Sequence, residues 1–468
     1  MEFEFNSSPE PTLGVEIELQ LVDRETRALT SAAAELIDSS GDVGWLKEEL
    51  LQSTIEINSD VCADIAEAEA DLGAKLEQVR ESARQRGLAL ISAGTHPFSR
   101  WEDQEVSQDV RYHRLVDRET RALSSAAAEL IDSSGEVSWL KEELLQSTIE
   151  INSDVCADIA EAEADLGAKL EKVRESARQR GLALISAGTH PFSRWEDQEV
   201  SQDVRYHRLV DKVQWPARRM LIFGLHVHVG VPDAESAIQI INHLEPWLPH
   251  LLALSASSPF WEGKDTGLAS CRSKIFETLP TAGLPYRHEN WEEFEQLVGA
   301  LIRSEGIESI REVWWDVRPH PGFGTVEVRV CDAMPTLEEN LAVAALVQAL
   351  IVFLQGQINQ GVTLPILHPR IVTENKWRAA RYSMEGTTIV DEDGAQRPIA
   401  ETMEQLLQDL APVFDRLGSA GQVPTLQRMI RGPSSYARQR RVFENAGATS
   451  AVVDALILEG ENGRPAEA

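Results

Sequence analysis

Residues 12–22 alternate between apolar and polar side chains, a pattern that predicts a β-strand with two different faces. Ile17 and Leu19 belong to the apolar row, whereas Glu16 and Glu18 belong to the polar row, because successive side chains of a strand point to opposite sides. Two carboxylates about 7 Å apart in one row suit a hard cation. Taken alone, the pattern is more typical of an edge strand with one solvated face.

Three later segments, 53–58, 223–231 and 325–330, repeat this alternation. Their polar rows carry, in chain order, Glu56, His226, His228, Glu327 and Arg329. If the four strands join one sheet, their apolar rows pack under helices and their polar rows share one open surface. Several carboxylates and an imidazole on one surface favour Mg²⁺ or Mn²⁺.

Each motif also has a simpler explanation. The histidines at 226 and 228 are compatible with Zn²⁺ binding or with a purely structural role. Glu327 and Arg329 lie two residues apart and can form an ion pair on one face of their strand. The joint pattern is more specific than its parts, because four separate segments carry metal-binding or phosphate-binding side chains on matching faces.

Apolar residues at helical spacing predict helices over 64–86, 233–254 and 337–357. The last of these is mostly apolar and is expected to lie in the core. The tail, 459–468, is expected to be disordered.

An internal repeat interrupts this plan. Leu21–Arg114 recurs 94 residues later as Leu115–Arg208, with four differences: Thr30/Ser124, Asp42/Glu136, Gly44/Ser138 and Gln78/Lys172. So long and so recent a repeat indicates one in-frame duplication rather than a solenoid. Removing one 94-residue copy from the 468 residues leaves 374. We therefore expect one catalytic domain over 1–468 with a surplus segment, its remainder lying at 209–458.

The duplication gives Glu56 a second copy, Glu150. Both glutamates could fill the same strand position, so we expect one copy to dock and the other to form a satellite or to pair with a partner subunit. Exposed apolar surface on the surplus copy favours association. The sequence therefore predicts a homo-oligomer, possibly a dimer, and raises the alternative of a catalytically impaired assembly protein.

The composition argues against two classes of binding partner and indicates a compartment. A net charge of −32 argues against nucleic acid and against an anionic membrane surface. No apolar run of about 18 residues and no signal peptide are apparent. Four cysteines without CxxC spacing indicate free thiols and a cytoplasmic protein. There is no P-loop pattern and no GxSxG motif.

The motifs resemble those of the glutamate–cysteine ligase type 2 family, the YbdK-like carboxylate–amine ligases. The resemblance is carried by Leu-Gly-Val-Glu-Ile-Glu-Leu (13–19), Ser-Thr-Ile-Glu-Ile-Asn (53–58 or 147–152), Gly-Thr-His-Pro-Phe (94–98 or 188–192), Phe-Gly-Leu-His-Val-His-Val-Gly (223–230), Ser-Ser-Pro-Phe-Trp (257–261), Thr-Val-Glu-Val-Arg-Val-Cys-Asp (325–332) and Glu-Asn-Lys-Trp-Arg-Ala-Ala-Arg-Tyr (374–382). With one repeat set aside, these blocks span nearly the whole chain.

The resemblance implies an α+β, glutamine-synthetase-like fold with a curved antiparallel sheet and helices on its outer face. It implies ATP- and Mg²⁺-dependent amide formation between glutamate and an amine such as cysteine, through an acyl phosphate. The implied metal ligands are Glu16, Glu18, Glu56 or Glu150, His226 and Glu327. Arg329 is the implied catalytic residue, and the candidates for substrate or ATP contact are His228, Arg272, Lys274, Lys376 and Arg378. A metal-dependent hydrolase that needs no nucleotide is the alternative enzyme.

Overall fold

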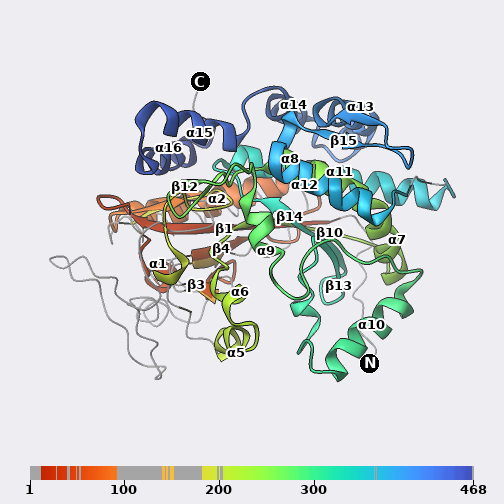
Figure 1. Ribbon diagram of the computed structural model, residues 1–468, viewed down its shortest axis with the longest axis horizontal. Coiled ribbons are helices and arrows are strands. Elements are labelled where there is room, and N and C mark those ends of the chain that lie inside the picture. The colour runs from red at the N-terminus through yellow and green to blue at the C-terminus, as the bar shows by residue number, and fades with distance from the viewer. Residues whose placement is uncertain are drawn as a thin grey trace.

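One open, mainly antiparallel sheet forms the centre of the protein, and helices cover its outer face (Figure 1). The expected α+β class is confirmed. The computed structural model describes residues 12–27, 29–38, 43–48, 50–51, 54–91, 140–142, 144–145, 148–151, 182–197, 200, 204–362, 364 and 366–465.

The four strands predicted to be two-faced lie side by side in the order β14, β10, β1 and β4, and all neighbours among them are antiparallel. The strands of the large sheet are β1 (Leu13–Asp23), β2 (Leu46–Glu48), β4 (Thr54–Asn58), β5 (Leu88–Ile91), β6 (Leu140–Glu142), β8 (Thr148–Ile151), β9 (Leu182–Ile185), β10 (Gly224–Gly230), β13 (Val317–His320) and β14 (Thr325–Asp332). Small two-stranded sheets are formed by β3 (Leu50–Leu51) with β7 (Leu144–Leu145), β11 (Phe260–Trp261) with β12 (Lys264–Asp265), and β15 (Thr387–Ile389) with β16 (Gln396–Pro398).

The apolar rows of these strands are buried under the helices, as their alternation predicts. Ile17, Leu225 and Val328 are fully shielded from solvent. Two long helices cover this side, α2 (Ile65–Arg84) and α11 (Leu337–Asn359), and they pack against each other. The polar rows are consequently left on the opposite face.

The other described helices are α1 (Ala33–Asp38), α5 (Val204–Val213), α6 (Trp215–Arg218), α7 (Ala234–Leu244), α8 (Leu248–Ser255), α9 (Cys271–Phe276), α10 (Trp291–Arg303), α12 (Pro369–Tyr382), α13 (Ile399–Arg416), α14 (Val423–Arg431), α15 (Ser435–Ala446) and α16 (Thr449–Asn462). The single helix expected over 233–254 is divided into α7 and α8 by a 3₁₀ turn, Glu245–Trp247. Pro246 and Pro249 explain the division, because proline lacks the amide hydrogen that a continuous helix requires.

The disordered tail expected from residue 459 is wrong for residues 459–462. Helix α16 continues to Asn462, Glu459 is buried, and Glu461 forms an ion pair with Arg84 of α2 at 2.9 Å. The ion pair with Arg84 ties this last turn to helix α2, which covers the sheet.

Helix α11 is long and apolar enough to cross a membrane by length and composition, contrary to the expectation that no such run exists. It lies inside the protein, where its residues from Glu339 to Val352 are all buried. Its apolar character is therefore explained by the core. Cys62, Cys271 and Cys331 are also buried, and none forms a disulfide within the described residues.

The two copies of the repeat bring equivalent strands to the same part of the sheet. Leu19 of β1 is in register with Ile55 of β4 and with Ile149 of β8, which are the same position in the two copies. Strand β2 likewise pairs with its equivalent β6, Lys47 opposite Lys141. The duplication thus supplies two candidate strands for one position.

Candidate active site

Five side chains predicted from the polar rows meet on the face of the sheet opposite the helices: Glu16, His226, His228, Glu327 and Arg329. Glu16 lies opposite His226 in the pairing of β1 with β10, and His228 lies opposite Glu327 in the pairing of β10 with β14. Antiparallel pairing places directly opposite side chains on the same face. Strand register therefore brings together residues that are more than 300 positions apart in the chain.

Three side chains of the types that bind metal ions lie close together at the centre of this face. One oxygen each from Glu16 and Glu327 and one ring nitrogen of His226 all lie within 4.8 Å of one another. His226 Nδ1 is 3.1 Å from Glu16 Oε2, and His228 Nε2 is 3.6 Å from Glu16 Oε1. This spacing is compatible with a single ion bound between the three groups.

Two arginines hold the Glu327 carboxylate. Arg318 donates to it from Nε at 2.5 Å and from Nη2 at 3.2 Å, and Arg329 donates from Nη1. The sequence analysis missed Arg318, which lies opposite Glu327 on the edge strand β13. The strand has four residues and contains Pro319, so it gives a weak strand signal. The alternation of Val317 and Arg318 was the only sign of a polar face.

The charges of this group are set by competition between burial and neighbouring cations. Burial alone would raise the pKa of Glu327, but Arg318 and Arg329 hold this pKa well below its ordinary value. Burial would likewise raise the pKa of Glu16, and hydrogen bonds with His226 and His228 lower it. Burial lowers the pKa of His226 to about 4, assisted by the charge of Arg329. Both carboxylates are therefore ionised at neutral pH, and His226 is neutral.

His228 is held in place by its second nitrogen and by ring contacts. Its Nδ1 lies 2.9 Å from the Thr325 hydroxyl, and its ring contacts those of His320 and Phe323 edge to face. His320 and Phe323 stack on each other with centroids 4.2 Å apart. This aromatic group forms one wall of the site, at the turn between β13 and β14.

Glu56 lies next to this group on β4 and is buried. It accepts a hydrogen bond from Asn58 and lies 3.6 Å from the Lys47 ammonium. Its backbone is paired opposite Glu18. The side chains of Glu18 and Glu150 lie outside what the structure describes, so their expected metal-binding role stays a prediction.

The remaining predicted contact residues lie in separate groups. Lys376 is buried between Asp316, at 2.5 Å, and Glu277, at 2.7 Å, and these acids raise its pKa against the effect of burial. Lys274 also pairs with Glu277, at 2.8 Å. Arg378 instead binds Glu374 on its own helix and Gln396 on β16. All three have acceptors within the protein.

Arg272 acts on the site from its edge. It is buried, and it donates to the backbone carbonyl oxygens of Val330, at 3.4 Å, and Arg329, at 3.3 Å. Gly224 leaves room for this contact, because a Cβ there would lie 2.1 Å from Arg272 Nη2. Arg272 thus supports the backbone of the strand that carries Glu327 and Arg329.

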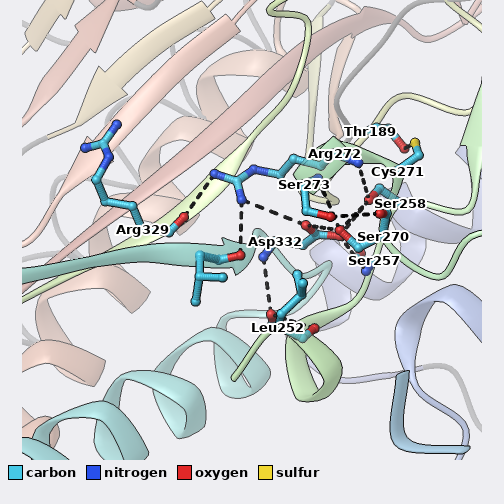
Figure 2. A network of polar contacts seen from close by, with 12 residues as sticks. Thr189, Leu252, Ser257, Ser258, Ser270, Cys271, Arg272, Ser273, Arg329 and Asp332 are labelled. Carbon is cyan, nitrogen blue, oxygen red and sulfur yellow. Dashed lines mark hydrogen bonds and ion pairs between the residues drawn. The ribbon is translucent and has the colours of Figure 1, made fainter. Parts of the chain in front are cut away.

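A buried cluster at the end of β14 holds Arg272 in turn. Figure 2 shows hydroxyl groups converging on Asp332, with Arg272 between this carboxylate and the carbonyl of Arg329. Asp332 accepts from the Ser258 hydroxyl at 2.6 Å and from the Ser270 hydroxyl at 2.8 Å. Ser258 lies in one of the blocks that carry the family resemblance, but no role was predicted for either serine, because single serines carry no periodic signal.

Comparisons with known proteins give matches in sequence and in fold. The family model for glutamate–cysteine ligase family 2 matches residues 12–125 and again residues 114–455. A Frankia casuarinae protein provisionally named glutamate–cysteine ligase 2-1 is 48% identical over 359 residues, 75% of this chain and 94% of that protein. A provisionally named glutamate–cysteine ligase 2 of Thermobifida fusca is 44% identical over 359 residues, 75% of this chain and 90% of its own length.

Two solved structures share the fold at low sequence identity. A glutamate–cysteine ligase from Francisella tularensis, in complex with AMP, has a TM-score of 0.57 at 11% identity and covers 98% of this chain and 90% of its own. A bifunctional glutathione synthetase from Pasteurella multocida has a TM-score of 0.58 at 13% identity, over 97% of this chain and 52% of that one. The family model covers most of the chain, and curated relatives are nearly half identical to it over three quarters of its length. The chain therefore belongs to glutamate–cysteine ligase family 2.

Proposed function

We propose that this protein is an ATP-dependent carboxylate–amine ligase that joins the γ-carboxylate of glutamate to an amine such as that of cysteine. The γ-phosphoryl group of ATP passes to the glutamate carboxylate, and the amine then displaces phosphate from the acyl phosphate. The products are the γ-glutamyl amide, ADP and phosphate. The observation that carries this proposal is the meeting of Glu16, His226 and Glu327 beside two guanidinium groups, in a chain of this family.

The donor set fits Mg²⁺ or Mn²⁺. Two ionised carboxylates supply the oxygen ligands that these ions prefer, and a neutral imidazole such as His226 keeps one nitrogen lone pair for a ligand bond. Glu16, His226 and Glu327 would hold the ion, with Glu18 and Glu56 as further candidates. When bound, a divalent ion neutralises charge on the phosphates of ATP during transfer.

Arg329 supplies the catalytic cation in this proposal. Its guanidinium lies against Glu327 and belongs to the same face as the metal group. A guanidinium of fixed position stabilises negative charge on a transferred phosphoryl group or on a substrate carboxylate. Arg318 holds the other side of Glu327 and so keeps that carboxylate, and through it Arg329, in place.

The test measures ADP release by the full-length chain with Mg²⁺-ATP and glutamate, with and without cysteine, together with γ-glutamylcysteine formation. We expect amine-dependent ADP release and that product. Replacing Glu16 by glutamine removes one ligand charge and should reduce the rate by about 100-fold or more. Glu401→Gln is the matched control, because Glu401 is an exposed acid of helix α13 that pairs with Arg397 of β16.

The two other candidates give different results in the same assay. A metal-dependent hydrolase would cleave its substrate without nucleotide and would release no ADP. An assembly protein inactivated by its duplication would neither bind nor turn over ATP. ATP turnover without γ-glutamylcysteine would place the protein among ligases for another amine, and absence of nucleotide binding would refute the proposal.

A further inference from the structure

The ends of the duplicated region are fixed in the domain by elements that cross its boundaries. Strand β1 runs without interruption from Leu13 into copy one, which begins at Leu21. Helix α5 runs from Val204, in copy two, through Arg208 into the unique remainder of the chain. The domain therefore begins with residues of copy one and ends its repeated part with residues of copy two. At one point between these ends, the residues that fill the domain must switch from the first copy to the second.

Copy one supplies the first part of the domain. Its strand β4 pairs with β1 over four residues, from Glu16 to Leu19, whereas the described part of β8 in copy two pairs with β1 at Leu19 and Gln20. Beyond β4, the copy-one residues make long-range contacts with the remainder of the chain. Arg84 pairs with Glu461, and Gln348 donates to the carbonyl oxygen of Ala63 at 3.3 Å.

A buried ion group fixes helix α2 of copy one to the loop after β4. Lys75 is fully buried and lies 3.1 Å from Asp60, and it also pairs with Asp71. Asp71 in turn accepts from the backbone amide of Asp60 at 2.7 Å. Such a group is stable only when all three charges are in place, because an unpaired buried charge is costly.

Copy two supplies the part of the domain after strand β9. The Thr189 hydroxyl donates to the carbonyl oxygen of Phe260 at 2.9 Å, and the Gly263 amide donates to that of Pro191 at 3.1 Å. Gly188 packs directly on Asp332, the centre of the buried cluster, so closely that a Cβ would lie 2.6 Å from its carboxylate. The second copy therefore completes the cluster that holds Arg272.

We infer that the working domain is a composite, with copy one present up to Ile91 and copy two present from Leu182 onward. The change of copy lies at β5 and β9, which are adjacent, parallel and identical in sequence, with Leu90 opposite Ile185. Because β5 and β9 have the same sequence, either strand can fill the shared position, and the surplus is one 94-residue copy, equivalent to residues 92–185. In this arrangement Glu56, and not Glu150, completes the active-site face.

Two matched pairs of variants in the full-length chain test the composite. Lys75→Met leaves Asp60 and Asp71 buried without their cation, so the melting temperature should fall by about 5 °C or more. Lys169→Met changes the equivalent position of copy two and should leave it unchanged. Gly188→Ala should lower the melting temperature by about 3 °C or more, whereas Gly94→Ala, its copy-one equivalent, should not.

This crossed pattern distinguishes the composite from every arrangement in which one copy docks whole. Sensitivity at Lys75 and Gly94 would mean that copy one docks alone, and sensitivity at Lys169 and Gly188 that copy two does; either result overturns the inference. Partial effects at all four positions would mean that the copies exchange, which also overturns it. Because melting is measured without substrates, these results are independent of the proposed ligase activity.

A deletion gives a second test. Removing residues 92–185 joins Ile91 to Ser186 and leaves 374 residues with no new sequence at the junction. We expect this variant to melt within about 2 °C of the full-length chain and cooperatively. Loss of folding in the deletion variant would show that the surplus is needed and would refute the composite.

Discussion

Two buried carboxylates on strand β14 lie five residues apart and have opposite electrostatic surroundings. Glu327 is bound by Arg318 and Arg329, and its pKa is held well below the ordinary value in spite of burial. Asp332 is surrounded by serine hydroxyls and a backbone amide, with Arg272 at 3.9 Å, and burial raises its pKa. The comparison shows that full burial alone does not decide the charge of an acid.

The different surroundings of Glu327 and Asp332 correspond to different roles for the two acids of strand β14. Glu327 lies with Glu16 and His226 in the candidate active site and keeps its negative charge through two cations in contact with it. Asp332 lies at the end of the strand, opposite Gly224, where it accepts hydrogen bonds from neutral donors, and its influence reaches the site through Arg272 and the carbonyl oxygen of Arg329. The acid in the candidate active site is thus bound by charged side chains, and the acid that supports the strand beside it is bound mainly by hydroxyl groups.

The largest expected effect comes from removing the charge of Glu327. Glu327→Gln leaves two guanidinium groups close together without their carboxylate, and breaking a buried pair in this way costs about 3–5 kcal/mol. Ligase activity should fall by about 100-fold or more. Urea unfolding and the ADP-release assay measure the two effects, and Glu327→Asp, which keeps the charge, should recover part of the stability.

A smaller effect is expected at the neutral end of the strand. Asp332→Asn preserves shape but turns one acceptor into a donor facing hydroxyl groups, so the free energy of unfolding should fall by about 1–2 kcal/mol. Activity should fall less than in Glu327→Gln, since Asp332 touches no reacting group. If Asp332→Asn were the more damaging of the two variants, the division between reacting face and support would be wrong.

The smallest effect is a difference in pH dependence. The folded pKa of Glu327 is depressed, so its contribution to stability is present above the unfolded pKa of about 4.3 and is lost as pH falls. The folded pKa of Asp332 is raised, so its contribution is greatest in acid and declines as pH rises above about 3.9. Each slope is at most about 1.4 kcal/mol per pH unit.

Urea unfolding of the wild type and both variants between pH 3.5 and 7 should separate these slopes. The stability difference between wild type and Glu327→Gln should shrink toward acid pH, and that between wild type and Asp332→Asn should shrink toward neutral pH. If both stability differences changed with pH in the same direction, the proposed electrostatic difference between Glu327 and Asp332 would be wrong.

Much of the fold and the centre of the site followed from alternation in the sequence. Glu16, His226 and Glu327 were predicted to share a face because each lies in the polar row of a strand whose other row is apolar. Period-two patterns give the face of every residue, so they also give the neighbours once the strands pair. The long core helix was predicted by a different signal, its helical spacing and mostly apolar composition.

The residues that the sequence did not reveal depend on tertiary contacts. Arg318 lies in a short, proline-containing strand, and its role is created by register with Glu327. Lys376 looked like a phosphate contact, but its ammonium group is enclosed by Asp316 and Glu277, which lie 60 and 99 residues earlier. The tail after Leu458 was expected to be disordered because it is polar. Its composition could not reveal that Glu461 pairs with Arg84, a contact between residues far apart in the chain.

The identity of β5 and β9 also has a consequence for inheritance. Residues 88–98 and 182–192 have the same sequence, so recombination between the copies can remove 94 residues and leave no scar. A lineage that carries the enlarged gene can return to the shorter one in a single event, without passing through a damaged intermediate. Point changes that accumulate in one copy alone will gradually close this route, and the four existing differences are its first steps.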